Sequence, residues 1–137
     1  MSDIADFLRA RYAEARSREE GVRRIVYPNP FTGHDVEVDS DGRVWIDRQE
    51  YPADRYWELA SEPGADPAVI ADLDAKLAIV DQHQDVNDGN CGTCVDGHWG
   101  YPTHGGSSPA TYPCRTLRLL AQPFAGHPDH KGEEWAP

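Results

Sequence analysis

The feature that most constrains this chain is the placement of its cysteines. All three lie in one stretch, CGTCVDGHWGYPTHGGSSPATYPC, which begins at Cys91, includes Cys94 and ends at Cys114. From residue 84 to residue 113 the chain is rich in Gly, Ser, Pro and His and has neither a helical nor a strand period, so we expect an irregular loop. A loop of about thirty residues without secondary structure is unusual in a small domain unless a cross-link replaces that structure.

A metal ion is the cross-link that these residues favour. Zinc takes four nitrogen or sulfur ligands in a tetrahedron, and a Cys-x-x-Cys pair offers two thiolates from one tight turn, which Gly92 would help to form. Cys114 adds a third thiolate at the expected start of a helix, where free amides favour negative charge. We choose His83 as the fourth ligand, because a side chain at a helix end is already oriented by packing. The alternatives for this position are His98, His104, His127 and His130.

The expected cofactor is therefore zinc, held by His83, Cys91, Cys94 and Cys114. A site closed by four protein ligands is structural and not catalytic. A thioredoxin-like redox pair fits less well, because the residues after Cys94 have no helical character. An iron–sulfur cluster normally takes four cysteines, and the His-x-Glu and Pro-Cys-x-x-Cys signature of zinc deaminases is not intact. The remaining interpretations of these cysteines are three unrelated thiols or a Cys–His catalytic pair.

Three segments have the apolar spacing of amphipathic helices. They cover residues 3–18, 66–83 and 114–122, and a shorter helix is expected over 54–60. Asp66-Pro67 is typical of a helix start, since Asp can cap the free amides and Pro needs no amide partner. The apolar faces consist of Ile4, Phe7, Leu8, Tyr12 and Ala15 in the first helix, Val69, Ile70, Leu73, Leu77 and Val80 in the second, and Leu117 and Leu120 in the third.

The segments 22–27, 36–39 and 43–47 alternate as strands do. Ser40-Asp41-Gly42 supplies residues that tolerate a tight turn, so the last two strands should form a hairpin. A sheet of two or three strands needs a helix against it, and we expect the N-terminal and central helices there. The predicted fold is α+β in one domain, 1–137. Its parts are an N-terminal helix (1–18), a small antiparallel sheet (22–52), a central helix (66–83), a zinc-stapled irregular loop (84–114) and a C-terminal helix with a tail (115–137).

The charge of the chain limits its partners. Asp and Glu number 24 against 13 Lys and Arg, for a formal net charge of -11. Such a chain repels phosphate backbones and anionic lipids unless basic residues cluster, and the group from Arg16 to Arg24 is interrupted by Glu19 and Glu20. We therefore expect no direct nucleic-acid contact through basic residues and no membrane role. The N-terminus lacks a basic leader and an apolar segment, and the odd cysteine count favours a reducing compartment, so we expect a cytoplasmic protein.

Several other side chains have an expected role or location. Trp99 and Tyr101, inside the cysteine-containing loop, either cover the metal site or bind a protein partner, and they are our partner-binding candidates. His34 is expected in a solvated turn and Trp135 is expected to dock the tail. Trp45 and Trp57 are expected in the core. The helical carboxylates Asp72, Asp74 and Asp81 fall outside the apolar face and should be solvated.

Three stretches resemble an uncharacterised family of small proteins from actinobacteria and some of their phages, a domain of unknown function. They are DIADFLRARYAEAR, DPAVIADLDAKLAIVDQH and YPCRTLRLLAQPFAGHPDHKGEEWAP. The resemblance implies a similar helical architecture, a variable loop that often contains cysteines, and no particular activity. It implies that His83, Cys114, His127 and Trp135 are family-type positions. The chain departs from the pattern at Gln122, His130 and Lys131.

The functional hypothesis from the sequence is a small, non-enzymatic, zinc-stabilised accessory protein that binds another protein, in a phage or mobile-element setting. It rests on a closed metal site without a catalytic constellation. Two alternatives stay open. One is a metal-dependent hydrolase in which water replaces one protein ligand, and the other is an acidic mimic of nucleic acid.

Overall fold

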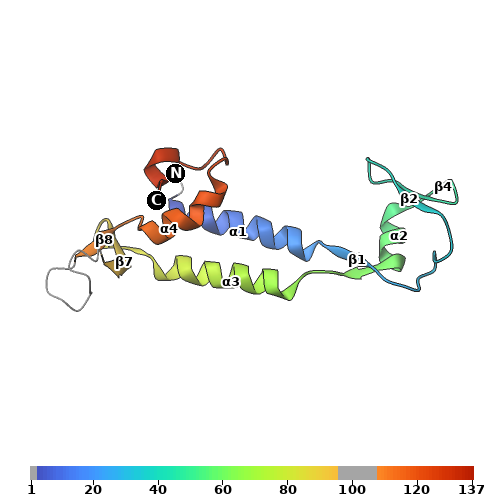
Figure 1. Cartoon of the computed structure of the whole chain (residues 1–137), viewed down its shortest axis with the longest axis horizontal. Coiled ribbons are helices and arrows are strands. Elements are labelled where there is room, and N and C mark those ends of the chain that lie inside the picture. Colours follow the sequence, from blue (N-terminus) through green and yellow to red (C-terminus); the bar gives the residue numbers. More distant parts are fainter. Residues whose placement is uncertain (1–2, 96–107) are drawn as a thin grey trace. The chain divides into compact units, whose positions relative to one another are not determined.

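The computed structural model describes residues 3–95 and 108–137 (Figure 1). It confirms the α+β class, with four α-helices and small antiparallel sheets among the described residues. The chain divides into two compact units, Met1–Arg16 with Ile70–Pro137, and Ser17–Val69. Each unit has its own cluster of buried apolar side chains. Within the described ranges, no helix combines the length and apolar character needed to cross a membrane.

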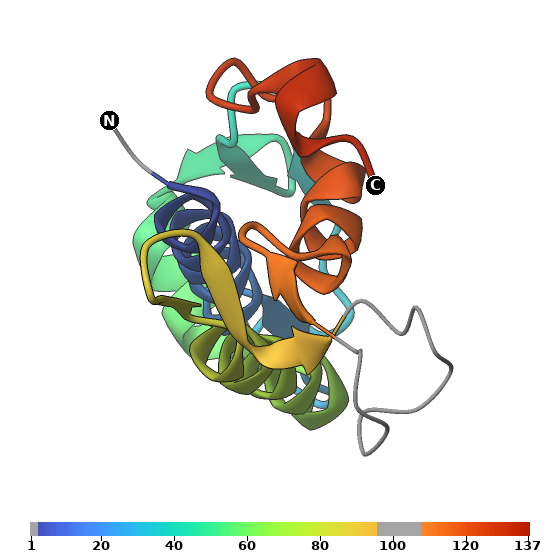
Figure 2. The ribbon, with the colours of Figure 1, turned by 90° about the vertical axis from the view of Figure 1, so that its left-hand side faces the viewer.

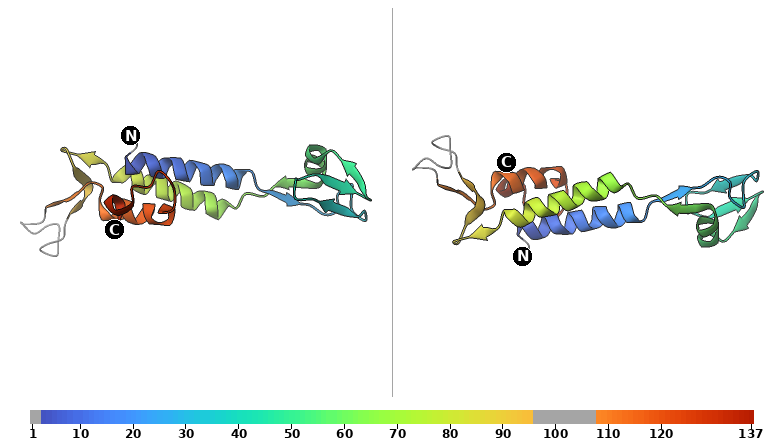
Figure 3. Two further views of the ribbon diagram at one scale, coloured as in Figure 1. Left: turned by 90° about the horizontal axis from the view of Figure 1, so that it is seen from above. Right: turned by 90° about the horizontal axis from the view of Figure 1, so that it is seen from below.

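The first unit is built mainly from α1 (Ile4–Glu20), α3 (Pro67–Gln82) and α4 (Arg115–Ala121). Two short 3-10 helices follow, η1 (Gln122–Phe124) and η2 (Gly132–Trp135). Figures 2 and 3 show α1 in blue, α3 in yellow-green and α4 in orange lying side by side. The predicted cap of α3 is present, since the Ala68 amide donates to Asp66 Oδ1 over 2.9 Å, and Asp3 caps α1 in the same way, because its Oδ1 accepts the Asp6 amide over 2.9 Å. These side chains satisfy amides that the first helical turn leaves free.

The core of this unit joins the apolar faces of the three helices. The buried side chains are Ile4, Ala5, Phe7, Leu8, Tyr12, Leu73, Val80, Cys91, Cys114, Leu117, Ala121 and Trp135. Most of the predicted apolar faces are therefore correct, and the tail docks through Trp135 as expected. Val69 is an exception because it is exposed. It lies in the first turn of α3, whereas this core reaches α3 only from Leu73 onward.

Two of the helical carboxylates that we expected in solvent also link helices. Arg9 donates to Asp81 over 2.9 Å, and Arg16 donates to Asp74, so two ion pairs, about two helical turns apart, link α1 to α3. Asp72 pairs instead with Lys76 on the same helix. All three carboxylates are exposed, so each pair stabilises the fold by only about 0–1 kcal/mol.

The second unit contains two sheets and α2 (Ala53–Ala60). β2 (Val36–Val38), β3 (Val44–Ile46) and β4 (Gln49–Tyr51) form a three-stranded antiparallel sheet. Its first two strands are the predicted hairpin, with Gly42 at a φ of 81° in the turn. β1 (Arg23–Ile25) does not join them, because it pairs with β5 (Ser61–Pro63).

The helix on the three-stranded sheet is α2. Val44 is fully buried and clusters with Tyr56 and Ala60 of that helix. The expectation that the N-terminal and central helices cover this sheet is wrong, since their buried residues belong to the other cluster. Trp57 is half-buried and packs against this cluster, whereas Trp45 is half-buried and lies outside it. His34 is exposed, as expected for a turn, and its Nδ1 lies 2.6 Å from Asp47 Oδ2.

The segment expected as an irregular loop contains a third antiparallel sheet. β6 (Asp85–Val86) pairs with β7 (Asn90–Val95), which also pairs with β8 (Pro109–Thr111). These strands lack the alternation of apolar and polar residues that would have revealed them. Their side chains are mostly exposed or half-buried, so no continuous core face imposes a pattern on the sequence.

Candidate metal centre

The four predicted ligands lie at the meeting point of three elements. His83 is the first residue after α3, Cys91 and Cys94 belong to β7, and Cys114 is the N-cap residue of α4. The last turn of α3 orients the histidine, since its amide donates to the carbonyl of Val80 over 3.1 Å. The sheet and the two helix ends therefore bring together residues up to 31 positions apart in the sequence.

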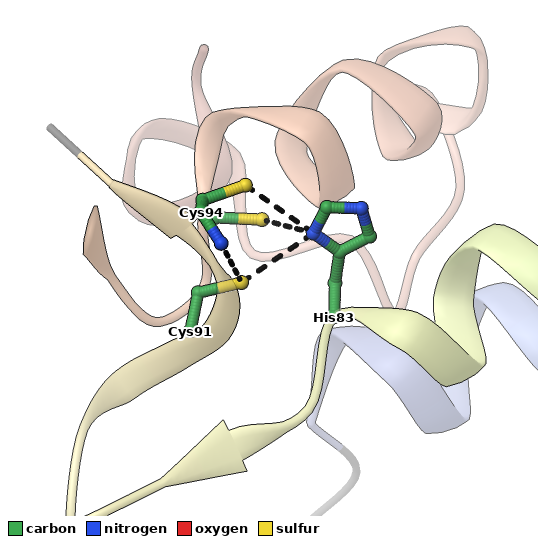
Figure 4. Close-up of side chains that lie close together, drawn as sticks. His83, Cys91 and Cys94 are labelled. Atoms are coloured by element: carbon green, nitrogen blue, oxygen red, sulfur yellow. Dashed lines mark hydrogen bonds between the residues drawn. The ribbon is translucent and has the colours of Figure 1, made fainter. Parts of the chain in front are cut away.

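The donor atoms converge on the His83 imidazole. Its Nδ1 lies 3.4 Å from Cys91 Sγ, 3.3 Å from Cys94 Sγ and 3.4 Å from Cys114 Sγ. Figure 4 shows His83 facing the sulfurs of the labelled Cys91 and Cys94. All four donor atoms lie within 4.8 Å of one another. Tetrahedral zinc, with bonds of about 2.0–2.3 Å, would separate its nitrogen and sulfur ligands by about 3.6 Å, so this cluster has the dimensions of a zinc site.

Electrostatics shift the pKa values of Cys91 and Cys94 in opposite directions. Burial opposes the Cys91 thiolate, but hydrogen bonds from the amides of Cys94 and Thr93 outweigh it and lower the pKa of Cys91 to about 7. Burial, followed by the neighbouring charge of Cys114, raises the pKa of Cys94 to about 11. Thiolates this close repel one another, and a cation bound among them would offset that repulsion.

Hydrogen bonds outside the four side chains support this geometry. The Cys94 amide donates to Cys91 Sγ over 3.4 Å, within the Cys-x-x-Cys turn. The Thr116 hydroxyl, in the first turn of α4, lies 3.9 Å from Cys94 Sγ. The Thr93 hydroxyl donates to the carbonyl of Gln82 at the end of α3. Sequence reasoning missed both threonines, because a hydroxyl near a ligand has no signature until the fold places it there.

Glycine has a different role in this turn from the one predicted. Gly92 is not among the residues with positive φ, so it does not provide a special backbone conformation. A Cβ at this position would lie 3.3 Å from Val86 Cγ1 on the neighbouring strand, so the glycine allows β6 and β7 to approach closely. The left-handed conformations occur in the turn between these strands, at Asn87, Asp88 and Gly89.

The alternative histidines of the tail lie in other surroundings. His127 accepts the Asp129 amide at Nδ1 over 3.0 Å, and its Nε2 contacts Arg11 Nη1. His130 accepts the Gly132 amide at Nδ1 over 2.9 Å and packs against the Phe7 and Trp135 rings. Neither belongs to the cysteine cluster. His98, His104 and the partner-binding candidates Trp99 and Tyr101 lie outside the described residues.

Three soft thiolates and one imidazole form a donor set suited to zinc, and hard cations such as calcium or magnesium prefer oxygen ligands.

Comparison with family models identifies the family of this chain. A model described as a family of unknown function, DUF6221, matches residues 1–137. The chain belongs to the DUF6221 family. No curated protein and no solved structure is similar enough to match this DUF6221 chain.

Membership in DUF6221 confirms the resemblance to a domain of unknown function over the whole chain. It does not assign a chemistry to the family. For this DUF6221 protein, the cluster of His83 with the three cysteines therefore carries the functional argument.

Proposed function

We propose that His83, Cys91, Cys94 and Cys114 bind one zinc ion and that this ion has a structural role. The observation that supports the proposal is the convergence of one imidazole nitrogen and three sulfurs within 4.8 Å. Four protein donors complete a tetrahedron and leave no position for water or substrate. The protein would then be a non-enzymatic, zinc-stabilised accessory protein.

The proposed ion would cross-link three elements of the first unit at one point. His83 follows α3, the cysteine pair lies on a sheet of short strands, and Cys114 begins α4. Small sheets are marginally stable by themselves, and a bound ion adds its binding free energy to the stability of the fold. We therefore expect the metal to hold β6, β7 and β8 against the ends of the two helices.

Metal analysis of the purified protein tests this proposal. We expect about one zinc per chain, with sulfur and nitrogen neighbours in a ratio of three to one by X-ray absorption spectroscopy. His83→Ala and Cys114→Ser should each lose most of the zinc. His34→Ala is a matched control, since it removes an exposed histidine outside the cluster, and it should retain the metal.

The same measurement separates the rival functions. A spectrum with three protein ligands and an oxygen from water would instead support the metal-dependent hydrolase. A protein that binds no zinc and keeps the same melting temperature in a strong chelator would contradict the structural role. The acidic mimic of nucleic acid is supported by net charge alone, and competition with DNA for a basic partner would reveal it.

The cellular setting and partner are further parts of the proposal. A reducing cytoplasm would keep three thiols free for a metal, and no disulfide joins them in the structure. We propose a protein partner in an actinobacterial, phage or mobile-element context, with Trp99 and Tyr101 in the contact. Affinity purification from the native host, with Trp99→Ala and Tyr101→Ala beside the wild type, tests this. An unchanged set of co-purifying proteins would contradict the assignment of these two residues.

A further inference from the structure

The three-stranded sheet of the second unit presents an indole between two carboxylates. Strand register places Trp45 of β3 opposite Glu37 of β2 and opposite Glu50 of β4. Directly opposed residues on neighbouring strands have Cβ atoms about 4.5–5.5 Å apart and point to the same face. The three side chains therefore form one row across the sheet, which we call the Glu–Trp–Glu row.

This row lies on the face of the sheet opposite α2. Val44, directly before Trp45, is fully buried and clusters with Tyr56 and Ala60 of that helix. Successive side chains of a strand point to opposite faces, so Trp45 points away from α2. Glu37 and Glu50 are exposed, and beyond the backbone pairing of the sheet neither carboxylate forms a hydrogen bond or ion pair with any residue that the structure describes.

The indole of the row is held in place and already contacts a cation. Its Nε1 donates to Asp39 Oδ2 over 3.2 Å, which fixes the ring orientation. The guanidinium of Arg43 lies 5.9 Å from the ring centroid, within the range of a cation–π contact, and its Nε also donates to Asp39. A hollow of about 510 Å³ beside the ring is lined by Glu37, Val38, Asp39, Trp45 and Arg48.

The charge around the row determines whether a cationic or an anionic ligand is attracted to it. Residues 35–54 contain seven Asp or Glu and two Arg, and both arginines lie beside the row, so the face keeps a smaller net negative charge than the count suggests. Phosphate groups and anionic lipid surfaces are repelled by such a face, and a second copy of the same acidic sheet would be repelled as well. A lysine or arginine side chain is attracted both by the free carboxylates and by the indole ring.

We propose that the Glu–Trp–Glu row is a docking surface for a basic segment of a partner protein. A lysine or arginine side chain of that segment would lie on Trp45, between the carboxylates of Glu37 and Glu50. The proposal goes beyond the zinc-stabilised scaffold. It uses residues of the second unit only and does not depend on a metal.

A labelled peptide of alternating lysine and alanine is a suitable probe, followed by fluorescence polarisation with the full-length protein. We expect binding that weakens as salt is added, and no binding of a matched glutamate–alanine peptide. Glu37→Gln with Glu50→Gln should weaken binding about tenfold, because both free carboxylates lose their charge. Trp45→Leu should weaken it about threefold or more through loss of the cation–π contact. Arg48→Gln should strengthen binding, since it removes a positive charge from the hollow.

The matched control is Glu58→Gln with Glu134→Gln. Both glutamates are exposed and outside the row, so the variant loses the same total charge and should bind within about twofold of the wild type. An equal loss in this control would mean attraction by net charge alone and would overturn the proposal. Absence of peptide binding, or equal binding of the glutamate peptide, would also overturn it. Circular dichroism and zinc content of each variant, measured on the same samples, separate this result from failure to fold or from failure of the zinc proposal.

Discussion

The Nδ1 of His83 lies 3.4 Å from the Sγ of Cys114, although the two residues are 31 positions apart. One follows the last turn of α3 and the other begins α4. Their contact brings two helix ends to the same point as the Cys-x-x-Cys turn of β7. The stability of this region should therefore depend on what the four side chains bind.

Removal of the proposed zinc should affect the two units differently. We expect a strong chelator to increase hydrogen exchange at amides of β7, β8 and α4, because these elements would lose their common cross-link. Amides of β2, β3 and β4 should exchange at unchanged rates, since none of the four ligands belongs to that unit. Mass spectrometry with peptide-level resolution makes the comparison. Equal loosening of both units, or no change in either, would contradict the structural role of the ion.

The hydroxyl of Thr116 should tune the affinity of the centre. It lies 3.9 Å from Cys94 Sγ, so Thr116→Val removes a polar neighbour while it keeps the shape of the side chain. Loss of such outer contacts typically lowers metal affinity about 10–100-fold, and we expect the lower end here because the contact is long. Competition with a zinc-binding dye measures the change. Thr116→Ser keeps the hydroxyl and should restore affinity, and equal affinities for Val and Ser would exclude a role for the hydroxyl.

Two leucines of α4 provide a test of the helical core. Leu117 is fully buried, whereas Leu119 on the same helix is 44% exposed. Leu117→Ala should therefore lower the free energy of unfolding by about 2–5 kcal/mol, through lost apolar burial and the cavity left behind. Leu119→Ala should change it by less than about 0.5 kcal/mol. Urea denaturation of both variants gives the comparison, and similar losses would mean that the packing of α4 differs from the one described.

The hairpin of the second unit should lose stability in acid through Asp39. Partial desolvation opposes ionisation of this carboxyl, but hydrogen bonds from Trp45 and Arg43 outweigh it and lower its pKa from 3.8 to about 2. A lowered folded-state pKa means that the stabilisation is complete above about pH 4 and disappears as the pH falls towards 2. Asp39→Asn should be less stable than the wild type near pH 7 and similar to it near pH 2. Fluorescence of the tryptophans during acid titration follows this transition. A constant difference between the two proteins across that range would count against the assignment.

Some strands could be predicted from sequence patterns and others could not. The turn at residues 40–42 contains Gly42 and correctly predicts the β2–β3 hairpin. The next turn uses Asp47 and Arg48, both at positive φ. Arg is uncommon at positive φ and no glycine follows Asp47, so the pair does not indicate a two-residue hairpin turn and β4 was missed. β5 was missed because Ser61 and Pro63 have no strand pattern, and only its partner β1, distant in the sequence, makes it a strand.

The sequence by itself determined the apolar faces of the helices and the first hairpin, and it singled out the four side chains that the structure brings into one cluster. The faces and the hairpin depend on local spacing, and the choice of the four side chains depended on residue chemistry, since thiol and imidazole groups are common metal ligands. Only the tertiary structure decided that Thr116 lies beside Cys94, that α2 covers the three-stranded sheet, and that Glu37, Trp45 and Glu50 share one face. Each of these relationships joins residues from different elements. They depend on strand register and helix packing, which act between segments far apart in the sequence, so no local sequence pattern predicts them.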